Sequence, residues 1–212
     1  MFRVVKSERM CATSAGSRGD DVGALLPAVR AGDVRATRTF VMAIGPHLLR
    51  VVRRVLGPEH PDVEDVTQEA VYGVLEALPR YRGECSVLHF ACRVAVLTAM
   101  NVRRIDGAEK RQRLRPSPRE VERLPSQRLG PERETAQQRI VAALRELLAR
   151  LPAPQAEALA LHCVVGYTVA EIASSSGISV ETVRSRLRLA KQALRRELAS
   201  DPALLESVGG GA

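Results

Sequence analysis

Tryptophan is absent from this chain of 212 residues, and aromatic residues of all kinds make up only 3% of it. A core built without large rings must be filled by leucine, valine, alanine and isoleucine, which supply most of the 45% hydrophobic content. Such residues pack closely between helices, whereas large rings favour strands. The composition therefore argues against a β-sandwich and predicts an all-α protein, with one ordinary domain or two small ones.

Long hydrophobic segments are missing as well. No run of the chain approaches the roughly 18 to 20 apolar residues that span a bilayer, and the N-terminus lacks the apolar core of a signal peptide. The four cysteines, at positions 11, 85, 92 and 163, do not have the spacing of a disulfide framework, which fits a reducing compartment. We therefore expect a cytoplasmic protein that does not insert into a membrane.

The sequence also lacks a nucleotide-binding loop and a nucleophile paired with a catalytic histidine. Cys85, His89 and Cys92 are spaced to share one helix face and resemble metal ligands. A zinc site needs a fourth ligand, which is not evident nearby, and cysteine often serves as a small buried hydrophobe. We expect no enzyme, cofactor or metal, and metal or redox sensing by this cluster stays an alternative.

Basic residues are in excess, with 32 lysines and arginines against 24 acidic residues and a net charge of +8. A charge of this sign attracts polyanions, which include both nucleic acids and anionic membranes. A membrane-binding helix would pair its basic face with a strongly apolar one, and no segment does so. The charge therefore favours a nucleic acid as partner over a membrane.

The segment Tyr167–Leu187, YTVAEIASSSGISVETVRSRL, has the residue types of two short helices joined by a tight turn. Thr168 and Glu171 are spaced as a capping box, and Gly177 falls in the turn, where a residue without Cβ tolerates positive φ. Ser179 can cap the second helix. The apolar positions that face between the helices are Val169, Ile172, Ala173, Ile178, Val183 and Leu187. This pattern predicts a helix-turn-helix.

The outward side of the second helix mixes long cations with hydroxyl residues, a composition suited to base edges and phosphates in a major groove. A basic face alone is more often simply hydrated. Here the capping box, the glycine and the apolar positions are all in register, which favours DNA binding. The outward residues are Thr182, Arg184, Ser185, Arg186 and Arg188.

Composition shifts divide the chain into two helical domains. Residues 22–105 have the apolar periodicity of four helices, and residues 138–199 form a second domain that ends in the helix-turn-helix. Between them, residues 106–137 are rich in Arg, Pro, Gln and Ser and lack an apolar stripe, so we expect a flexible linker. Residues 1–21 and 200–212 are expected to be tails.

Capping and stop signals set the helix boundaries of the first domain. Leu25, Leu26 and Val29 begin a short helix that Gly32 ends. Asp33 can cap a long second helix that Gly57 stops, and Asp62 can cap a third helix. A fourth helix is expected over residues 86–104. We therefore expect four helices packed into one compact domain.

The order of these parts resembles a bacterial extracytoplasmic-function (ECF) sigma factor. The stretches that carry the resemblance are LLPAVRAGD, DVEDVTQEA and ALPRYRGECS in the first domain, and LPAPQAEALAL through SVETVRSRLRLAKQALRREL in the second. The resemblance covers residues 22–104 and 139–198. Response regulators share the second half alone, whereas both halves in this order are specific.

The resemblance implies a non-enzymatic subunit of RNA polymerase that reads two promoter elements, helps to open the duplex and is silenced by an anti-sigma factor. Asp65, Gln68 and Glu69 would dock on the clamp helices of the largest polymerase subunit. Asp65 and Glu69 belong with Asp62 and Glu64 to an acidic patch that suits a basic partner. The dipole of the helix would also favour acidic residues in its first turn.

The resemblance also implies two DNA-binding surfaces. The −10 element would be captured as a flipped, unstacked base, which needs aromatic stacking and phosphate contacts. Candidates for this surface are Arg80, Tyr81, Arg82, Arg93, Asn101, Arg103 and Arg104. The −35 element would be read in the major groove by Glu181, Thr182, Arg184, Ser185, Arg186, Arg188 and Lys191.

The chain departs from the family pattern in its fourth helix. Phe90 stands where the family commonly has Trp, and Val96 and Leu97 stand where it commonly has Arg-Asn. Fewer polar and aromatic groups leave less to grip a single strand, so we expect weak intrinsic melting or an unusual −10 preference. Phe90 is expected to be a core residue.

Two other functions remain open. A stand-alone helix-turn-helix regulator would bind DNA without polymerase, but its receiver domain would alternate strands with helices, which this chain does not. An inactive sigma-like protein that titrates a partner is supported by the missing Arg-Asn pair. The acidic DVEDVTQEA segment and the linker between two helical domains argue against the stand-alone regulator.

Overall fold

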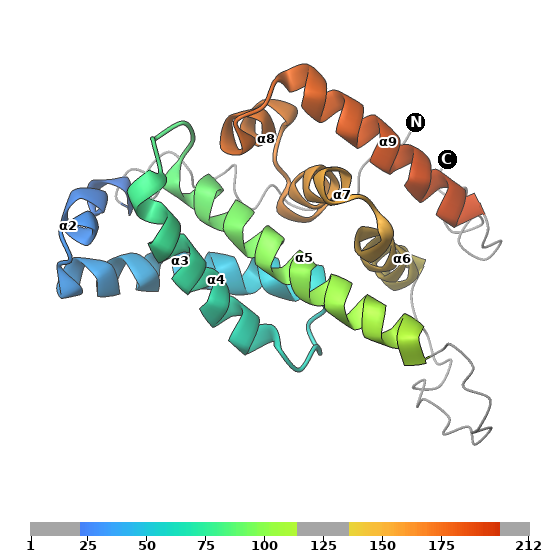
Figure 1. Ribbon diagram of the computed structural model, residues 1–212, viewed down its shortest axis with the longest axis horizontal. Coiled ribbons are helices and arrows are strands. Elements are labelled where there is room, and N and C mark those ends of the chain that lie inside the picture. Colours follow the sequence, from blue (N-terminus) through green and yellow to red (C-terminus); the bar gives the residue numbers. More distant parts are fainter. Residues whose placement is uncertain (1–21, 114–135, 200–212) are drawn as a thin grey trace.

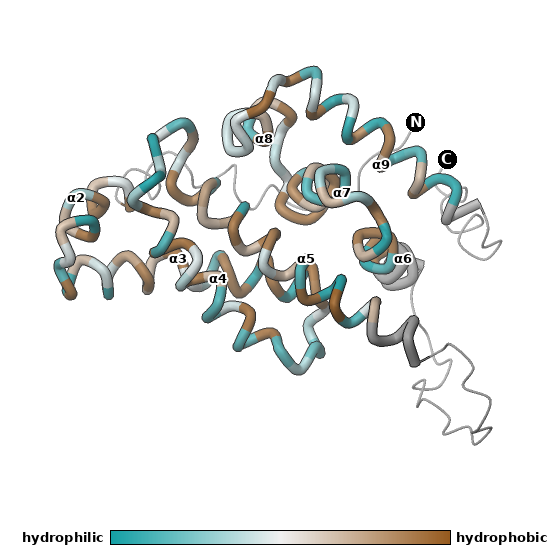
Figure 2. The backbone as a smooth tube through the Cα atoms, viewed as in Figure 1, coloured by the Kyte–Doolittle hydropathy of each residue, from teal (hydrophilic) through white to brown (hydrophobic). Residues whose placement is uncertain are grey.

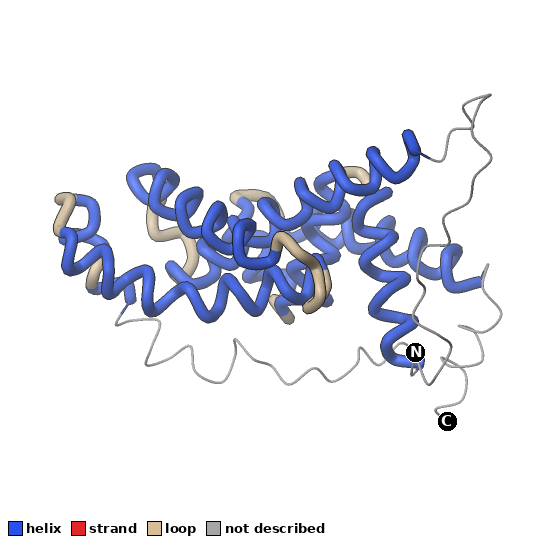
Figure 3. The backbone as a smooth tube through the Cα atoms, turned by 90° about the horizontal axis from the view of Figure 1, so that it is seen from below, coloured by secondary structure: helices blue, strands red, loops and turns tan. Residues whose placement is uncertain are grey.

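The computed structural model describes residues 22–113 and 136–199 of the chain (Figure 1). Within those ranges the regular elements are helical and none is a strand, which confirms the all-α class (Figure 3). The first domain contains α2 (Leu26–Arg30), α3 (Val34–Leu56), α4 (Val63–Ala77), the 3₁₀ turn η1 (Leu78–Arg80) and α5 (Val87–Arg113). The second contains α6 (Ala136–Arg150), α7 (Ala153–Ala160), the π-helical turn η2 (Leu161–Val165), α8 (Val169–Ser176) and α9 (Val180–Ala199).

Helices α3, α4 and α5 pack against one another and build the core of the first domain. Apolar residues recur every three or four positions along α3, so they line one face of that helix. Phe40, Ile44 and Leu48 are fully buried on this face. Figure 2 shows the same alternation of hydrophobic and hydrophilic residues along the other helices. The core is filled almost entirely by aliphatic side chains, as the composition predicted.

Only one of the two predicted aspartate caps forms. The Asp33 side chain accepts hydrogen bonds from the backbone N–H groups of Arg35 (2.8 Å) and Ala36 (3.0 Å), and Gly57 ends α3 with φ +115°. Asp62 stands at the N-cap of α4, but its side chain makes no cap hydrogen bond. Its backbone is not extended (ψ 11°), unlike that of Asp33 (ψ 115°), and an extended backbone is the usual geometry of an N-cap residue. The prediction of a capping Asp62 was wrong.

Helix α5 is longer than predicted. It was expected to end at Arg104 and continues to Arg113, so the first part of the predicted linker is helical. That part lacks an apolar stripe, yet arginine, lysine, glutamate and glutamine are good helix formers. The remainder of the predicted linker up to residue 135, and both predicted tails, lie outside the described residues.

The predicted helix-turn-helix is confirmed by α8 and α9. Thr168 and Glu171 form a reciprocal capping box, in which the Glu171 carboxylate accepts the Thr168 N–H at 2.7 Å. Gly177 ends α8 in the left-handed region with φ +63°. Ser179 caps α9 by accepting the N–H of Thr182 at 3.1 Å. Local sequence signals therefore determine both ends of the turn.

The second domain lies along α5, with α7 between α5 and α9 (Figure 1). Buried apolar residues of the two domains form one connected cluster. None of the helices in the part of the chain that the structure describes is long and apolar enough to span a bilayer.

The two aspartates at helix N-caps give a matched test of capping. Asp33→Ala removes two hydrogen bonds and is expected to lower the free energy of unfolding by about 1 kcal/mol. Asp62→Ala removes no cap hydrogen bond and is expected to cost less than about 0.5 kcal/mol. Urea unfolding of both variants measures the difference, and equal losses would contradict the capping geometry.

Candidate nucleic-acid and polymerase interfaces

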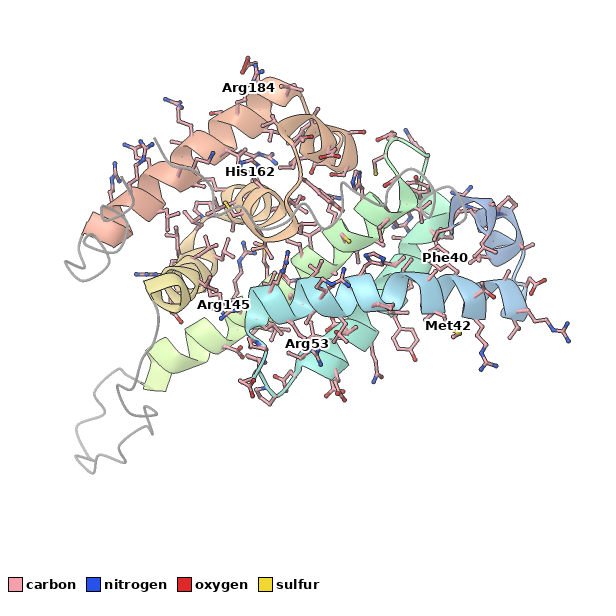
Figure 4. All side chains as sticks on the ribbon, turned by 180° about the vertical axis from the view of Figure 1, so that it is seen from behind. Phe40, Met42, Arg53, Arg145, His162 and Arg184 are labelled. Atoms are coloured by element: carbon pink, nitrogen blue, oxygen red, sulfur yellow. The ribbon has the colours of Figure 1, made fainter. Side chains whose placement is uncertain are left out.

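Helix α9 has one buried side and one exposed side. Val183, Leu187 and Ala190 are buried against the rest of the second domain, where α7 and α8 pack on α9. The other side of the helix carries the predicted −35 residues, and Arg184 lies on the outer surface of the molecule (Figure 4). The exposed members are Glu181, Thr182, Arg184, Ser185, Arg188 and Lys191, and Arg186 is half-buried.

One exposed ion pair lies on this surface. Arg184 Nη1 is 2.9 Å from Glu181 Oε1, three residues earlier on the same helix. Pairs of this kind contribute only about 0.3–0.5 kcal/mol. The pair is therefore weak enough to exchange for a phosphate or a base edge.

The turn η1 and the loop that joins it to α5 contain three of the predicted −10 residues. Arg80 and Arg82 are exposed there. The ring of Tyr81 instead packs on Phe90, with the ring centroids 5.0 Å apart, and its hydroxyl donates to the Cys85 carbonyl. Burial, followed by the nearby Cys85 thiol, raises the pKa of Tyr81 against a smaller lowering by Arg30. Tyr81 and the half-buried Phe90 thus pack together under the loop.

The remaining predicted −10 residues are spread along α5. Arg93 Nε lies 2.7 Å from Glu157 Oε1 of α7, a carboxylate that is only 12% exposed. Arg103 donates to the backbone carbonyls of Val55 (3.4 Å) and Leu56 (3.3 Å). Its Nη2 also lies 3.6 Å from a carboxylate oxygen of α6, on Glu146. Asn101 is exposed and Arg104 is half-buried. The structure does not gather the seven predicted residues into one patch.

The second domain occupies the side of α5 that carries Arg93. The His89 ring packs on that of Tyr167, with centroids 4.3 Å apart, and His89 Nε2 lies 3.8 Å from Glu171 Oε1. Ser174 of α8 donates its hydroxyl to the carbonyl of Glu84 in the loop before α5. The described arrangement therefore covers part of the predicted −10 surface.

A second set of contacts joins α3 to the second domain. Arg54 Nη1 donates to the Val164 carbonyl at 2.9 Å, and Arg145 Nε donates to the Arg54 carbonyl at 3.1 Å. Figure 4 shows Arg145 where α6 faces the first domain. Burial, followed by the neighbouring Arg103, lowers the pKa of Arg145. Arginine side chains thus satisfy backbone carbonyls across the domain boundary.

The Glu171 carboxylate belongs to both the capping box and the domain boundary. Burial raises its pKa, but hydrogen bonds from the Thr168 N–H and hydroxyl and the nearby His89 outweigh this effect, so the net pKa is lowered. A lowered pKa keeps the side chain ionised at neutral pH. The charge that holds the capping box therefore also faces the first domain.

The cysteine and histidine side chains do not converge on a metal site. Cys92 is buried, Cys85 is half-buried, and His89 already contacts Tyr167. In residues 22–113 and 136–199, no group of three or more His, Cys, Asp or Glu residues could hold a metal ion. Burial raises the pKa of the Cys85 and Cys163 thiols, which disfavours the reactive thiolate.

The predicted polymerase-docking residues lie on the exposed side of α4. Asp65, Gln68 and Glu69 are exposed and spaced one helical turn apart along this side. The same stripe continues to Tyr72, which is 66% exposed, and to Glu76. The sequence analysis missed Tyr72, although its position one turn beyond Gln68 and Glu69 was a usable signal.

Two further residues escaped the sequence analysis. Glu157 is the partner of Arg93, from which it is separated by 64 positions in the chain. Arg30, at the end of α2, hydrogen-bonds the backbone on both sides of η1. Contacts with distant side chains and backbone carbonyls leave no trace in local periodicity.

Family models match both domains. A model for Sigma-70 region 2 matches residues 40–107, and a model for Sigma-70 region 4 matches residues 142–194. The first match spans most of α3 to α5, and the second spans α7, α8 and parts of α6 and α9. The two matches therefore include the surfaces described above.

Among the proteins that are similar to the chain are two ECF sigma factors and the solved structure of CnrH. The chain is 32% identical over 185 residues to the ECF RNA polymerase sigma factor SigD of Mycobacterium tuberculosis, with 85% of each chain covered. It is 32% identical over 179 residues to the ECF RNA polymerase sigma factor ShbA of Streptomyces griseus, covering 82% of this chain and 93% of that one. The solved structure of CnrH, in complex with the cytosolic domain of CnrY, has the same fold at 22% identity. Its TM-score is 0.51, with 84% of this chain and 96% of that chain covered.

The Arg93–Glu157 pair gives a test of the domain packing. Glu157→Gln removes the charge from a mostly buried partner and is expected to weaken the contact between the domains by about 1–2 kcal/mol. The radius of gyration measured by small-angle X-ray scattering should rise. Glu181→Gln is the matched control, because its pair with Arg184 is exposed and lies within one helix. No change in Glu157→Gln, or an equal change in the control, would contradict a role for the pair in holding the domains together.

Proposed function

Since the chain belongs to the ECF RNA polymerase sigma factors, we propose that α4 docks on core RNA polymerase and that α5 and α9 bind promoter DNA. The observation that carries the proposal is a separation of charge between the two matched regions. Exposed carboxylates lie on α4, whereas exposed guanidinium groups lie on α9 of the second domain. A polyanion and a basic protein surface would each find a complementary partner on this molecule.

The polymerase-docking surface consists of Asp65, Gln68, Glu69, Tyr72 and Glu76. Its partner is the pair of clamp helices in the largest subunit of the core enzyme. Tyrosine is enriched among residues that dominate binding energy, and an exposed ring between carboxylates can hold an arginine by a cation–π contact. Exposure of Tyr72 in a chain so poor in aromatics supports this role.

The −35 element is read by the exposed side of α9 in the major groove. Arginine can donate two hydrogen bonds to guanine, and hydroxyl residues can contact bases or phosphates. Arg184 and Arg188 are exposed for such contacts, and Lys191 farther along the helix is suited to a phosphate. Arg186, which is half-buried, has less freedom to reach the groove.

The −10 element is held by the loop at Arg80–Arg82 and by α5. Arg93 and Arg103 pair with carboxylates of the second domain in the described arrangement, so promoter binding requires the domains to separate. Val96 is fully buried and Leu97 half-buried, which leaves no polar pair at this point of α5. We therefore expect weak grip on the melted strand or an unusual −10 preference.

An anti-sigma factor is the second protein partner that we propose. The solved complex of CnrH with the cytosolic domain of CnrY shows that a protein of this fold binds another protein. Such a partner could act by stabilising the packed arrangement of the two domains.

Substitutions on α9 and α4 should separate the two activities. Arg184→Ala/Arg188→Ala is expected to weaken binding to a duplex with the −35 element at least about 10-fold, since each arginine–guanine contact is worth about 1–3 kcal/mol. Asp65→Ala/Glu69→Ala is expected to weaken core binding by about 10-fold or more. Fluorescence anisotropy measures the first affinity and a pull-down titration the second. The duplex comes from a promoter that the wild-type holoenzyme selects from genomic fragments.

Control variants that remove exposed charges elsewhere test for a general electrostatic effect. Arg35→Ala/Arg38→Ala removes two exposed cations from α3, and Glu59→Ala removes an exposed carboxylate outside α4. Both should leave duplex and core affinities within about twofold of wild type. Equal loss of both affinities in either test variant would contradict the division between α4 and α9.

A further inference from the structure

The loop that carries Arg80, Tyr81 and Arg82 is held in place from outside by α2. Arg30 is the last residue of α2 and donates hydrogen bonds from Nε (3.3 Å) and Nη2 (3.1 Å) to the Leu78 carbonyl. Its Nη2 also donates to the Tyr81 carbonyl. One planar guanidinium thus bridges the two ends of η1, although about 50 residues of chain separate the groups.

The anchor of this bridge is itself fixed. Leu25, Leu26 and Val29 are partly buried against the hydrophobic core, which seats α2 on the first domain. The chain then turns at Gly32, with φ +82°, into α3. Arg30 therefore extends from a packed helix, so its backbone is already ordered when the side chain bonds the loop.

The bridge limits how the loop can move. The Leu78 carbonyl also accepts the Tyr81 N–H at 3.2 Å, which closes the turn. Tyr81 is consequently held at its backbone by Arg30, at its ring by Phe90 and at its hydroxyl by the Cys85 carbonyl. Arg80 and Arg82 are exposed, and their backbones adjoin this fixed residue on either side.

We propose that Arg30 is a positioning residue for recognition of the −10 element: it bonds the two ends of η1 and so presents Arg80 and Arg82 to the melted strand in a fixed orientation. The proposal rests on the proposed function of the loop. Arg30 acts through the loop and not by touching DNA. A preorganised loop avoids the entropy cost of ordering when the strand binds.

The test uses full-length protein in complex with core polymerase. The probe is a fluorescent single strand that carries the −10 element of a promoter selected by the wild-type holoenzyme from genomic fragments. Arg30→Met keeps a long side chain without donors and is expected to weaken strand binding by about 10-fold, because the loop must then be ordered on binding. Core affinity and binding of the −35 duplex should stay within about twofold of wild type. Arg30→Lys should lose nearly as much, since an ammonium cannot reproduce the fork of a guanidinium.

The salt dependence distinguishes positioning from direct contact. A residue that neutralises a phosphate contributes about 0.7 to the slope of log affinity against log salt for a single strand. Arg30→Met should leave this slope unchanged, whereas a slope reduced by that amount would overturn the positioning role. Arg35→Met, an exposed cation on the adjacent α3, is the matched control and should bind the strand like wild type.

Three further outcomes would also overturn the proposal. They are wild-type strand binding by Arg30→Met, equal losses in Arg35→Met, and a parallel loss of core affinity that would reveal a general structural defect. Failure of the proposed function is a separate result, since in that case the wild-type holoenzyme itself would not prefer the −10 strand over a scrambled one.

Discussion

Burial of helix α5 on two sides is the constraint on which the rest of the arrangement depends. One side packs on α3 and α4 and completes the first domain, and the other contacts α7 and α8. The same helix carries Arg93 and Arg103, which the family resemblance assigns to the promoter. In the described arrangement the carboxylates of Glu157 and Glu146 lie against these guanidinium groups. Under the proposed function, packing between the domains and DNA binding compete for the same side chains.

The acidic groups of this basic protein are of two kinds, exposed and nearly buried. The net charge of +8 attracts a polyanion over long range, whereas the acidic α4 surface and the carboxylates of the second domain are local exceptions to that charge. Carboxylates on α4 are exposed and free to meet a basic protein, and Glu157 is nearly buried against an arginine of its own chain.

Sequence reasoning succeeded where the signal was local and failed where it was not. Thr168, Glu171, Gly177 and Ser179 lie within twelve residues, and each adopts the capping or turn geometry that its chemistry predicts. Asp62 has the right residue type, but its backbone is not extended and its side chain does not cap α4. The extension of α5 to Arg113 was not predicted because this part of the chain lacks the apolar periodicity that marks the other helices. Its arginine, lysine, glutamate and glutamine residues nevertheless have a high helix propensity. Arg30 and Glu157 bond groups that are roughly 50 and 64 positions away, so no local pattern could reveal them.

Transcription by the reconstituted holoenzyme shows whether this chain selects promoters as a subunit of RNA polymerase. Purified protein is mixed with sigma-free core polymerase and fragments of its own genome, and the transcripts are sequenced. The expected result is a set of discrete start sites that share upstream motifs at the −10 and −35 positions. Stable binding to the core enzyme without any discrete start site would contradict the claim and would favour a homologue that titrates its partner.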